Sequence, residues 1–147
     1  MYKRILVATD GSPLSKKAVK DAIALGASLE ADLVALNVVP RYPMSYFEGG
    51  ATISPQDVGR IEKEWADRGQ AIADAVQKSA EAAGVKAKAL IAKSDLVASA
   101  ILAAAKKNKC DLIVMASHGR KGLSRILLGS ETQQVLTHST IPVLVLR

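Results

Sequence analysis

The residues best suited to chemistry lie near the C-terminal end, where nine residues separate Gly119 from Gly129-Ser130. The apolar run Leu112–Met115 precedes them and has the character of a buried strand. After the second glycine, the run S-E-T-Q predicts a capping box with Ser130 as N-cap. A strand end, a glycine-containing loop and a helix N-terminus are together typical of a phosphate-binding site.

The two glycines allow a second interpretation. Glycine lets a phosphate approach the backbone closely, but it also simply permits turns. Neither G-x-x-x-x-G-K-[ST] nor G-x-G-x-x-G occurs, so a phosphate site here would be of another kind. Glu131 would repel a phosphate, but only its backbone N–H is needed and its side chain can point to water. The basic residues between the glycines could offset phosphate charge or be solvated: Arg120, Lys121 and Arg125.

Asp10 is a second candidate, because it directly follows the first apolar run, Arg4–Ala8. In an open α/β sheet, ligands bind beyond the carboxyl ends of the strands, and a carboxylate there can accept hydrogen bonds from a ribose. Asp-Gly before a capping serine is equally good turn chemistry. The spacing alone leaves the two interpretations equal.

The remaining reactive side chains do not form a recognisable catalytic set. His118 has no serine or cysteine partner at a known spacing, and a loop histidine bonded to backbone is the commoner case. With Cys110 the only cysteine and only one other histidine, His138, no ordinary zinc site forms from protein side chains. No paired carboxylates are placed for acid–base work. We expect no efficient enzyme.

Composition favours one domain spanning residues 1–147, with a core of Ala, Val, Leu and Ile, because aromatic residues make up only 3%. The net charge of +6 is spread along the chain and is typical of a solubilising surface, so nucleic-acid binding is disfavoured. The sequence shows no signal peptide or membrane-length apolar run, which predicts a cytoplasmic protein without a membrane partner. A lone cysteine agrees with a reducing compartment.

Five apolar runs with strand character alternate with four helical segments, which predicts a mostly parallel sheet with helices on both faces. The predicted strands are Arg4–Ala8, Asp32–Val38, Val85–Ile91, Asp111–Met115 and Pro142–Leu146.

Helix starts are predicted at Ser12-Pro13, at Ser54-Pro55 and at Ser94-Asp95, and Gly84 is expected to end the second helix. The connection from Pro40 to Ser54 is unusually long and holds Tyr42, Tyr46 and Phe47. It is either a lid or interface segment or a surface excursion.

At this point the chain resembles the universal stress protein family over essentially its whole length. The resemblance rests on I-L-V-A-T-D-G-S at residues 5–12 and on the run from Asp111 to Arg147. The latter contains S-H-G-R, L-L-G-S and P-V-L-V. The resemblance implies an open, doubly wound, Rossmann-like sheet of five parallel strands in the order 3-2-1-4-5, with four helices.

One branch of that family binds ATP through G-x2-G-x9-G-[ST]. Gly119, Gly129 and Ser130 match the motif, and Ala116 replaces its first glycine. The resemblance implies adenine packed near Ala8, Val38 and Met115, ribose on Asp10, and phosphates on the backbone of the glycine segment. Mg²⁺ or Mn²⁺ would be held by the phosphates. The implied nucleotide-binding set is Ala8, Thr9, Asp10, Val38, Met115, Ala116, Gly119, Gly129, Ser130 and Glu131.

The family commonly dimerises through its last strand, and the apolar run at residues 141–146 agrees with this. The leading hypothesis is a homodimeric, ATP-binding stress-response regulator with at most slow hydrolysis. The alternative is a member of the family that binds no nucleotide and works through protein contacts, for which Ala116 is the main support. Nothing resembles a nucleophile elbow or C-x-x-C, so a hydrolase or redox enzyme has little support.

Overall fold

The computed structural model describes residues 1–42, 54–119 and 128–147. Within these ranges the five strands form one parallel sheet in the order β3-β2-β1-β4-β5, which confirms the predicted doubly wound fold. Its elements in chain order are β1 (Arg4–Ala8), α1 (Pro13–Leu29), β2 (Asp32–Val39), α2 (Pro55–Ala82), β3 (Ala87–Lys93), α3 (Val97–Lys107), β4 (Leu112–Ala116), α4 (Ser130–His138) and β5 (Val143–Leu146).

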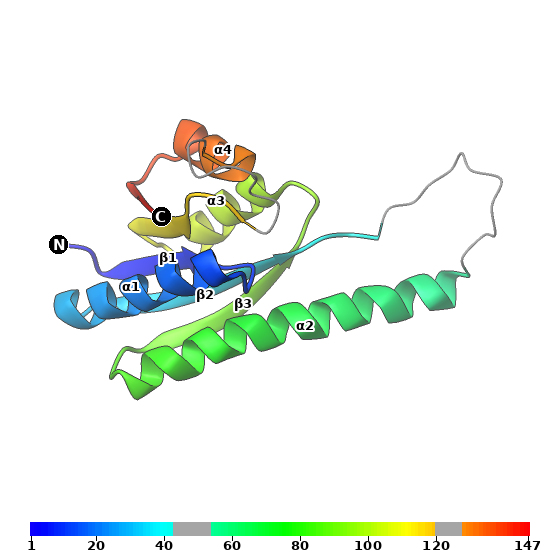
Figure 1. Ribbon diagram of the computed structural model, residues 1–147, viewed down its shortest axis with the longest axis horizontal. Helices are drawn as coiled ribbons and strands as arrows, with labels where there is room; N and C mark the ends of the chain where they lie inside the picture. Colours follow the sequence, from blue (N-terminus) through cyan, green and yellow to red (C-terminus); the bar gives the residue numbers. More distant parts are fainter. Residues whose placement is uncertain (43–53, 120–127) are drawn as a thin grey trace.

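The helices divide between the two faces of the sheet (Figure 1). Helices α1 and α2 cover one face, where alternate strand residues such as Ile5, Val7 and Val114 pack with Ala22 and Val76. Helices α3 and α4 cover the other face, where the intervening strand residues join Ile101 and Val135: Leu6, Val34, Leu36, Ile113 and Met115. The middle strands are therefore buried on both sides, as their continuous apolar runs predict.

Three predicted helix ends are confirmed. Ser12 and Ser54 are N-caps whose side chains accept hydrogen bonds from Ser15 N and Asp57 N. Each is followed by proline at the first helical position, where its missing N–H costs nothing. After α2, Gly84 has a φ of +78°, a left-handed conformation that favours glycine.

The predicted start of α3 and both predicted ends of β3 were wrong. Ser94 and Asp95 do not open α3, because the Ser94 hydroxyl makes a local turn with Leu96, and Leu96 itself is the N-cap without a side-chain bond. β3 begins at Ala87 rather than Val85, because Val85 N donates to Ala80 O and so still belongs to the closing turn of α2. It ends at Lys93 rather than Ile91, because its pairing with β2 continues that far. The other strands differ from prediction by at most one residue at either end.

Most of the predicted long connection lies outside the described residues, including Tyr46 and Phe47. Its first residues continue from β2, and Tyr42 stacks on Trp65 of α2 with ring centroids 5.9 Å apart. Figure 1 shows the N-terminal part of α2 extending beyond the sheet.

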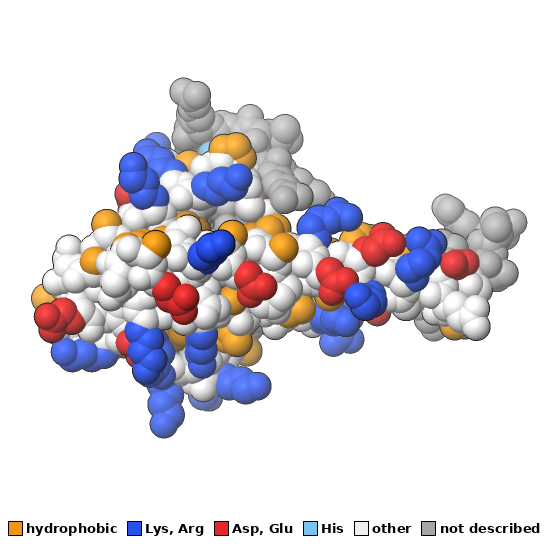
Figure 2. Space-filling model, turned by 90° about the horizontal axis from the view of Figure 1, so that it is seen from below, with side chains coloured by type: hydrophobic (Ala, Val, Ile, Leu, Met, Phe, Trp, Pro, Cys, Tyr) orange, Lys and Arg blue, Asp and Glu red, His pale blue; other side chains and the backbone are white. Residues whose placement is uncertain are grey.

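The exposed face of α2 carries intermixed charges (Figure 2). Arg60 pairs with Asp57 and Glu64, and Lys63 lies 2.7 Å from Asp67. Exposed pairs of this kind contribute little stability and mainly keep a helix face hydrated.

Cys110 is buried at the end of α3, and desolvation raises the pKa of its thiol to about 11. A thiol in this state is a poor nucleophile. Among the described helices, none is both long and apolar enough to span a membrane.

Helix α2 approaches the sheet most closely at Gly69. A Cβ at this position would lie 2.5 Å from Asn37 Oδ1 and 2.7 Å from Val39 Cγ2. Gly59, two to three turns earlier in the same helix, has nothing within 4 Å of the equivalent point. The two glycines therefore differ in what they do: the first permits helix–sheet contact, and the second only adds conformational freedom.

We expect Gly69→Ala to lower the free energy of unfolding by about 1–3 kcal/mol, because the added methyl overpacks the α2–β2 contact. The matched substitution Gly59→Ala should raise it by roughly 0.5–1 kcal/mol through helix propensity alone. Urea unfolding followed by circular dichroism measures both. Equal effects at the two positions would contradict the close approach.

Candidate functional site

The turn after β1 is held by a dense set of hydrogen bonds. Thr9 N donates to Leu36 O at 3.0 Å, and Thr9 Oγ1 lies 3.0 Å from Ser15 Oγ. From the neighbouring strand β2, Asn37 Nδ2 donates to Thr9 O at 2.9 Å. Buried polar groups that are all paired form a rigid support, so the residue after Thr9 has a defined position.

That residue is Asp10, and its carboxylate serves the turn. Asp10 Oδ1 accepts from Ser12 N at 2.9 Å, and Gly11 between them has a φ of +77°. The structure therefore confirms that Asp10 stabilises the turn. This does not exclude a second role, because Asp10 also lines the pocket described below.

The N-terminus of α4 differs from prediction. The N-cap is Gly129, with extended φ and ψ of −61° and 150°, and Ser130 is the first helical residue. The predicted capping box is absent: Gln133 Nε2 donates to Leu128 O at 3.0 Å instead of returning to an N-cap amide. The reason lies in a tertiary bond, since Gly129 N already donates to Ser117 O at 2.8 Å.

Two contacts seat α4 on the end of β4. Besides the Gly129–Ser117 bond, Thr132 Oγ1 donates to Ala116 O at 3.0 Å, and Thr132 is only 2% exposed. Because both acceptors are consecutive carbonyls at the strand end, the first turn of α4 is fixed over the carboxyl edge of the sheet. Its free amides therefore open toward the same edge as the Asp10 turn.

Each candidate glycine lies close to a neighbour that an added methyl group would press on. A Cβ on Gly119 would lie 2.7 Å from Asp10 Oδ2, and a Cβ on Gly129 would lie 3.1 Å from His118 Cα. Neither residue has a left-handed φ. Close approach, rather than turn conformation, is therefore what favours glycine here.

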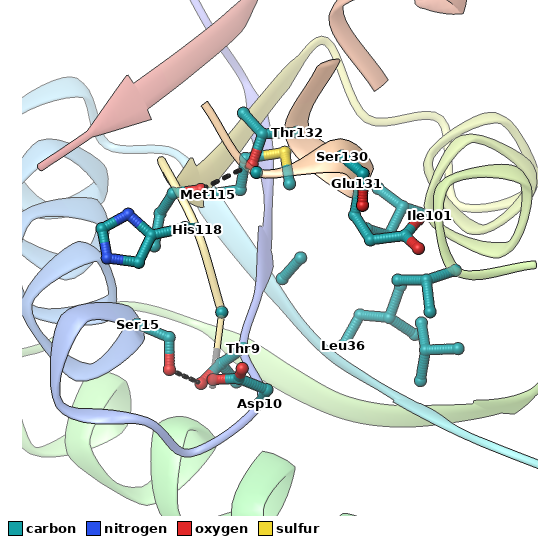
Figure 3. A pocket seen from close by; sticks show the side chains of 16 residues that line it. Thr9, Asp10, Ser15, Leu36, Ile101, Met115, His118, Ser130, Glu131 and Thr132 are labelled. Atoms are coloured by element: carbon teal, nitrogen blue, oxygen red, sulfur yellow. Dashed lines mark hydrogen bonds between the residues drawn. The ribbon is translucent and has the colours of Figure 1, made fainter. Parts of the chain in front are cut away.

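A pocket of about 430 Å³ lies between these elements (Figure 3). Apolar side chains from β2, α3 and β4 form part of its wall, and Asp10 and the start of α4 supply polar groups. All ten residues of the sequence-predicted set line it: Ala8, Thr9, Asp10, Val38, Met115, Ala116, Gly119, Gly129, Ser130 and Glu131. The structure thus brings together every residue of that set, although Arg120, Lys121 and Arg125 lie outside the described residues.

Six further lining residues were missed by sequence reasoning: Ser15, Leu36, Val97, Ile101, His118 and Thr132. A signal existed for three of them. Leu36 is two residues before Val38 on the same strand face, and Val97 and Ile101 share one helix face at a spacing of four. Sequence reasoning weighed His118 as a catalyst and as a loop histidine bonded to backbone, but not as a pocket residue. Its Nδ1 lies 3.1 Å from Ser117 Oγ.

The side chain of Glu131 also differs from expectation. Instead of pointing to water alone, its Oε2 accepts from Ala98 N at 3.2 Å, so α4 supplies an acceptor to the first turn of α3. Figure 3 shows Glu131 beside Ser130 and near Ile101 of α3. A hydrogen bond therefore links the N-terminal turns of α3 and α4 beside the pocket.

Comparison with known proteins identifies the family. The model described as the universal stress protein family matches residues 1–147. Universal stress protein MJ0531 of Methanocaldococcus jannaschii is 38% identical over 148 residues, which cover all of this chain and 83% of that protein. The chain belongs to the universal stress protein family.

Solved structures of the family have the same fold. A universal stress protein from Burkholderia pseudomallei is 25% identical with a TM-score of 0.76, covering 99% of this chain and 96% of its own. Another universal stress protein was solved in complex with cAMP; it is 25% identical with a TM-score of 0.67, covering 99% of this chain and 97% of its own.

Ala116 is where this universal stress protein departs from the ATP motif. It is the last residue of β4 and is 6% exposed. The backbone at Ala116 is not left-handed and so suits an L side chain. Among the described residues other than glycine, only Glu30 and Lys109 have a positive φ. The methyl group costs no strain, and its effect is confined to the pocket wall.

The two motif glycines should respond differently to a methyl group. Gly129→Ala presses on the His118 backbone and should lower the free energy of unfolding by about 1–3 kcal/mol. Gly119→Ala presses only on the end of the Asp10 side chain, which can move, so its cost should be roughly 1 kcal/mol or less. Urea unfolding of both variants tests this. A larger loss for Gly119→Ala would contradict the assigned contacts.

Proposed function

We propose that this universal stress protein binds an adenine nucleotide in the 430 Å³ pocket and acts as a ligand-dependent, dimeric stress-response regulator. The observation that carries the proposal is the convergence of ten residues, chosen from the sequence, on one cavity. Its size falls within the roughly 300–1,000 Å³ of small-molecule sites. The cAMP complex of a relative 25% identical to this chain adds support.

The pocket offers a suitable environment for each part of a nucleotide. Leu36, Val38 and Met115 present an apolar surface for the base. Asp10 provides carboxylate oxygens for ribose hydroxyls. The first-turn amides of α4, at Ser130 and Glu131, provide donors for a phosphate at the positive end of the helix dipole.

A divalent cation would be held by the phosphates in this proposal. Within residues 1–42, 54–119 and 128–147, no three His, Cys, Asp or Glu side chains gather as a metal site. Two carboxylates line the pocket, those of Asp10 and Glu131, and each accepts a main-chain N–H bond. Mg²⁺ or Mn²⁺ usually retains several waters and binds through substrate phosphates with few protein ligands.

Regulation, rather than efficient hydrolysis, agrees with the roles of these two carboxylates. A general base must reach an attacking water, whereas in this proposal Asp10 binds the ribose and Glu131 Oε2 accepts from Ala98 N. The proposed role is a change of state on binding, with at most slow turnover.

A second candidate function is a protein-binding member of the family that takes no nucleotide. Ala116 in place of the first motif glycine favours it, because the methyl group occupies part of the pocket wall. Absence of nucleotide both from the purified protein and in equilibrium dialysis at millimolar ATP, ADP and AMP would support this candidate over the first.

We expect the wild-type protein to bind adenosine nucleotides in equilibrium dialysis, and Asp10→Asn to weaken binding about five- to tenfold. Asparagine keeps an oxygen for Ser12 N but loses the charge that strengthens bonds to ribose hydroxyls. The loss should vanish for a 2′,3′-dideoxy analogue, which lacks those hydroxyls.

Asp74→Asn on exposed α2 is the matched control, because it removes the same charge away from the pocket. It should bind like the wild type. Equal weakening of ribose and dideoxy ligands by Asp10→Asn would remove Asp10 from the ribose contact. No binding to the wild type would overturn the proposal itself.

The dimer belongs to the same proposal and rests on β5. This strand lies at one edge of the sheet and pairs with β4, and Leu144 is 39% exposed. Pro142 O and Leu146 O accept from β4, at Ile113 N and Ser117 N. Because peptide groups alternate along a strand, the N–H groups of Val143 and Val145 face the free edge, where a second copy could pair.

Val145→Pro should therefore convert the dimer to a monomer in sedimentation equilibrium while circular dichroism stays unchanged, since proline removes an outward donor only. Val145→Thr keeps the N–H and the branched Cβ, and should remain dimeric. A dimeric Val145→Pro protein would place the interface elsewhere.

A further inference from the structure

Helix α3 depends on another helix for its cap. Its N-cap position is Leu96, which makes no side-chain cap bond and is 68% exposed. The nearby Ser94 hydroxyl is used in a turn with Leu96. Within the described residues, the side chain that accepts from the first turn of α3 is Glu131, at 3.2 Å from Ala98 N. A helix N-terminus left without an acceptor loses about 1 kcal/mol, so this contact stabilises α3.

The same contact places a negative charge at the phosphate end of the pocket. Glu131 is the second residue of α4, directly after Ser130, and the backbone of this turn is where a phosphate would bind. The carboxylate lines the pocket, where Figure 3 shows it beside Ser130, and its bond from Ala98 N favours this position when an anion arrives. An anion bound at α4 therefore meets both a helix dipole that attracts it and a carboxylate that repels it.

We propose that Glu131 determines which phosphate group the pocket accepts. It favours a monophosphate, or a triphosphate complexed with a divalent cation, over a free triphosphate. This inference rests on the proposed nucleotide site and adds its charge selectivity. The carboxylate acts as a fixed negative charge whose cost rises with the charge of the ligand's phosphate end.

The size of the effect follows from Coulomb's law. A free triphosphate carries roughly two more negative charges than a monophosphate or a magnesium complex. At a separation of roughly 7 Å and an effective dielectric between protein and water, one extra charge changes affinity roughly three- to tenfold. Glu131 is exposed, so the lower part of that range is expected at physiological salt.

Glu131→Gln separates the charge from the cap, because the glutamine amide keeps an oxygen for Ala98 N. Binding of AMP, of ATP with EDTA and of ATP with Mg²⁺ is measured by isothermal titration calorimetry. We expect the free-ATP to AMP affinity ratio to rise at least about threefold in Glu131→Gln, while the Mg-ATP to AMP ratio changes about twofold or less, because those two ligands carry similar net charge. In high salt this gain should shrink, because screening removes the repulsion.

Two controls isolate the role of the carboxylate. Glu81→Gln removes one charge from the C-terminal end of α2, and should leave the ratio unchanged. Glu131→Ala removes both charge and acceptor, so it should lower the unfolding temperature, whereas Glu131→Gln should keep it near the wild type.

The outcomes are distinct. An unchanged ratio in Glu131→Gln, or an equal change for all three ligands, overturns the inference but leaves the nucleotide site intact. A gain for free ATP that does not depend on salt also overturns it. If neither the wild type nor any variant binds AMP or ATP, the proposed function fails, and the charge selectivity fails with it.

Discussion

The docking of the first turn of α4 onto the end of β4 is the constraint on which the site depends. Two carbonyls, of Ser117 and Ala116, accept from Gly129 N and Thr132 Oγ1. This arrangement favours a glycine at 129, because a side chain would press on the His118 backbone. With α4 seated there, its N-terminal amides face the Asp10 turn and Glu131 reaches α3. Without this docking, α4 would lose its fixed position relative to the Asp10 turn and α3, which also line the pocket.

Helix starts were predictable from the sequence where the capping hydrogen bond joins residues close together in the chain. Ser12-Pro13 and Ser54-Pro55 cap their helices through bonds three residues apart, and sequence alone contains that information. The alternation of apolar runs and helical segments predicted a parallel sheet but not the order of its strands, which came from the family resemblance. Ser130 and Ser94 failed as caps for a physical reason: a tertiary bond from Gly129 and a local turn at Leu96 took precedence over propensity.

The candidate site was predictable to the extent that it follows strand ends. Asp10, Val38 and Met115 come after or within strands whose carboxyl ends must meet at one edge, so their convergence follows from a parallel sheet. The link from Glu131 to Ala98 spans 33 positions in the chain and depends on how two helices sit relative to each other. No spacing rule contains such a contact, which is why the residue was judged to face water.

The stacked pair of Tyr42 and Trp65 has a practical meaning for this chain. Trp65 is its single tryptophan, and it lies one turn before Gly69, on α2, away from the cavity lining. Tryptophan fluorescence therefore reports on α2 and not on the residues that line the pocket. A change in that emission on adding a small molecule would report a rearrangement that reaches α2 from the pocket, a readout of long-range coupling that needs no label.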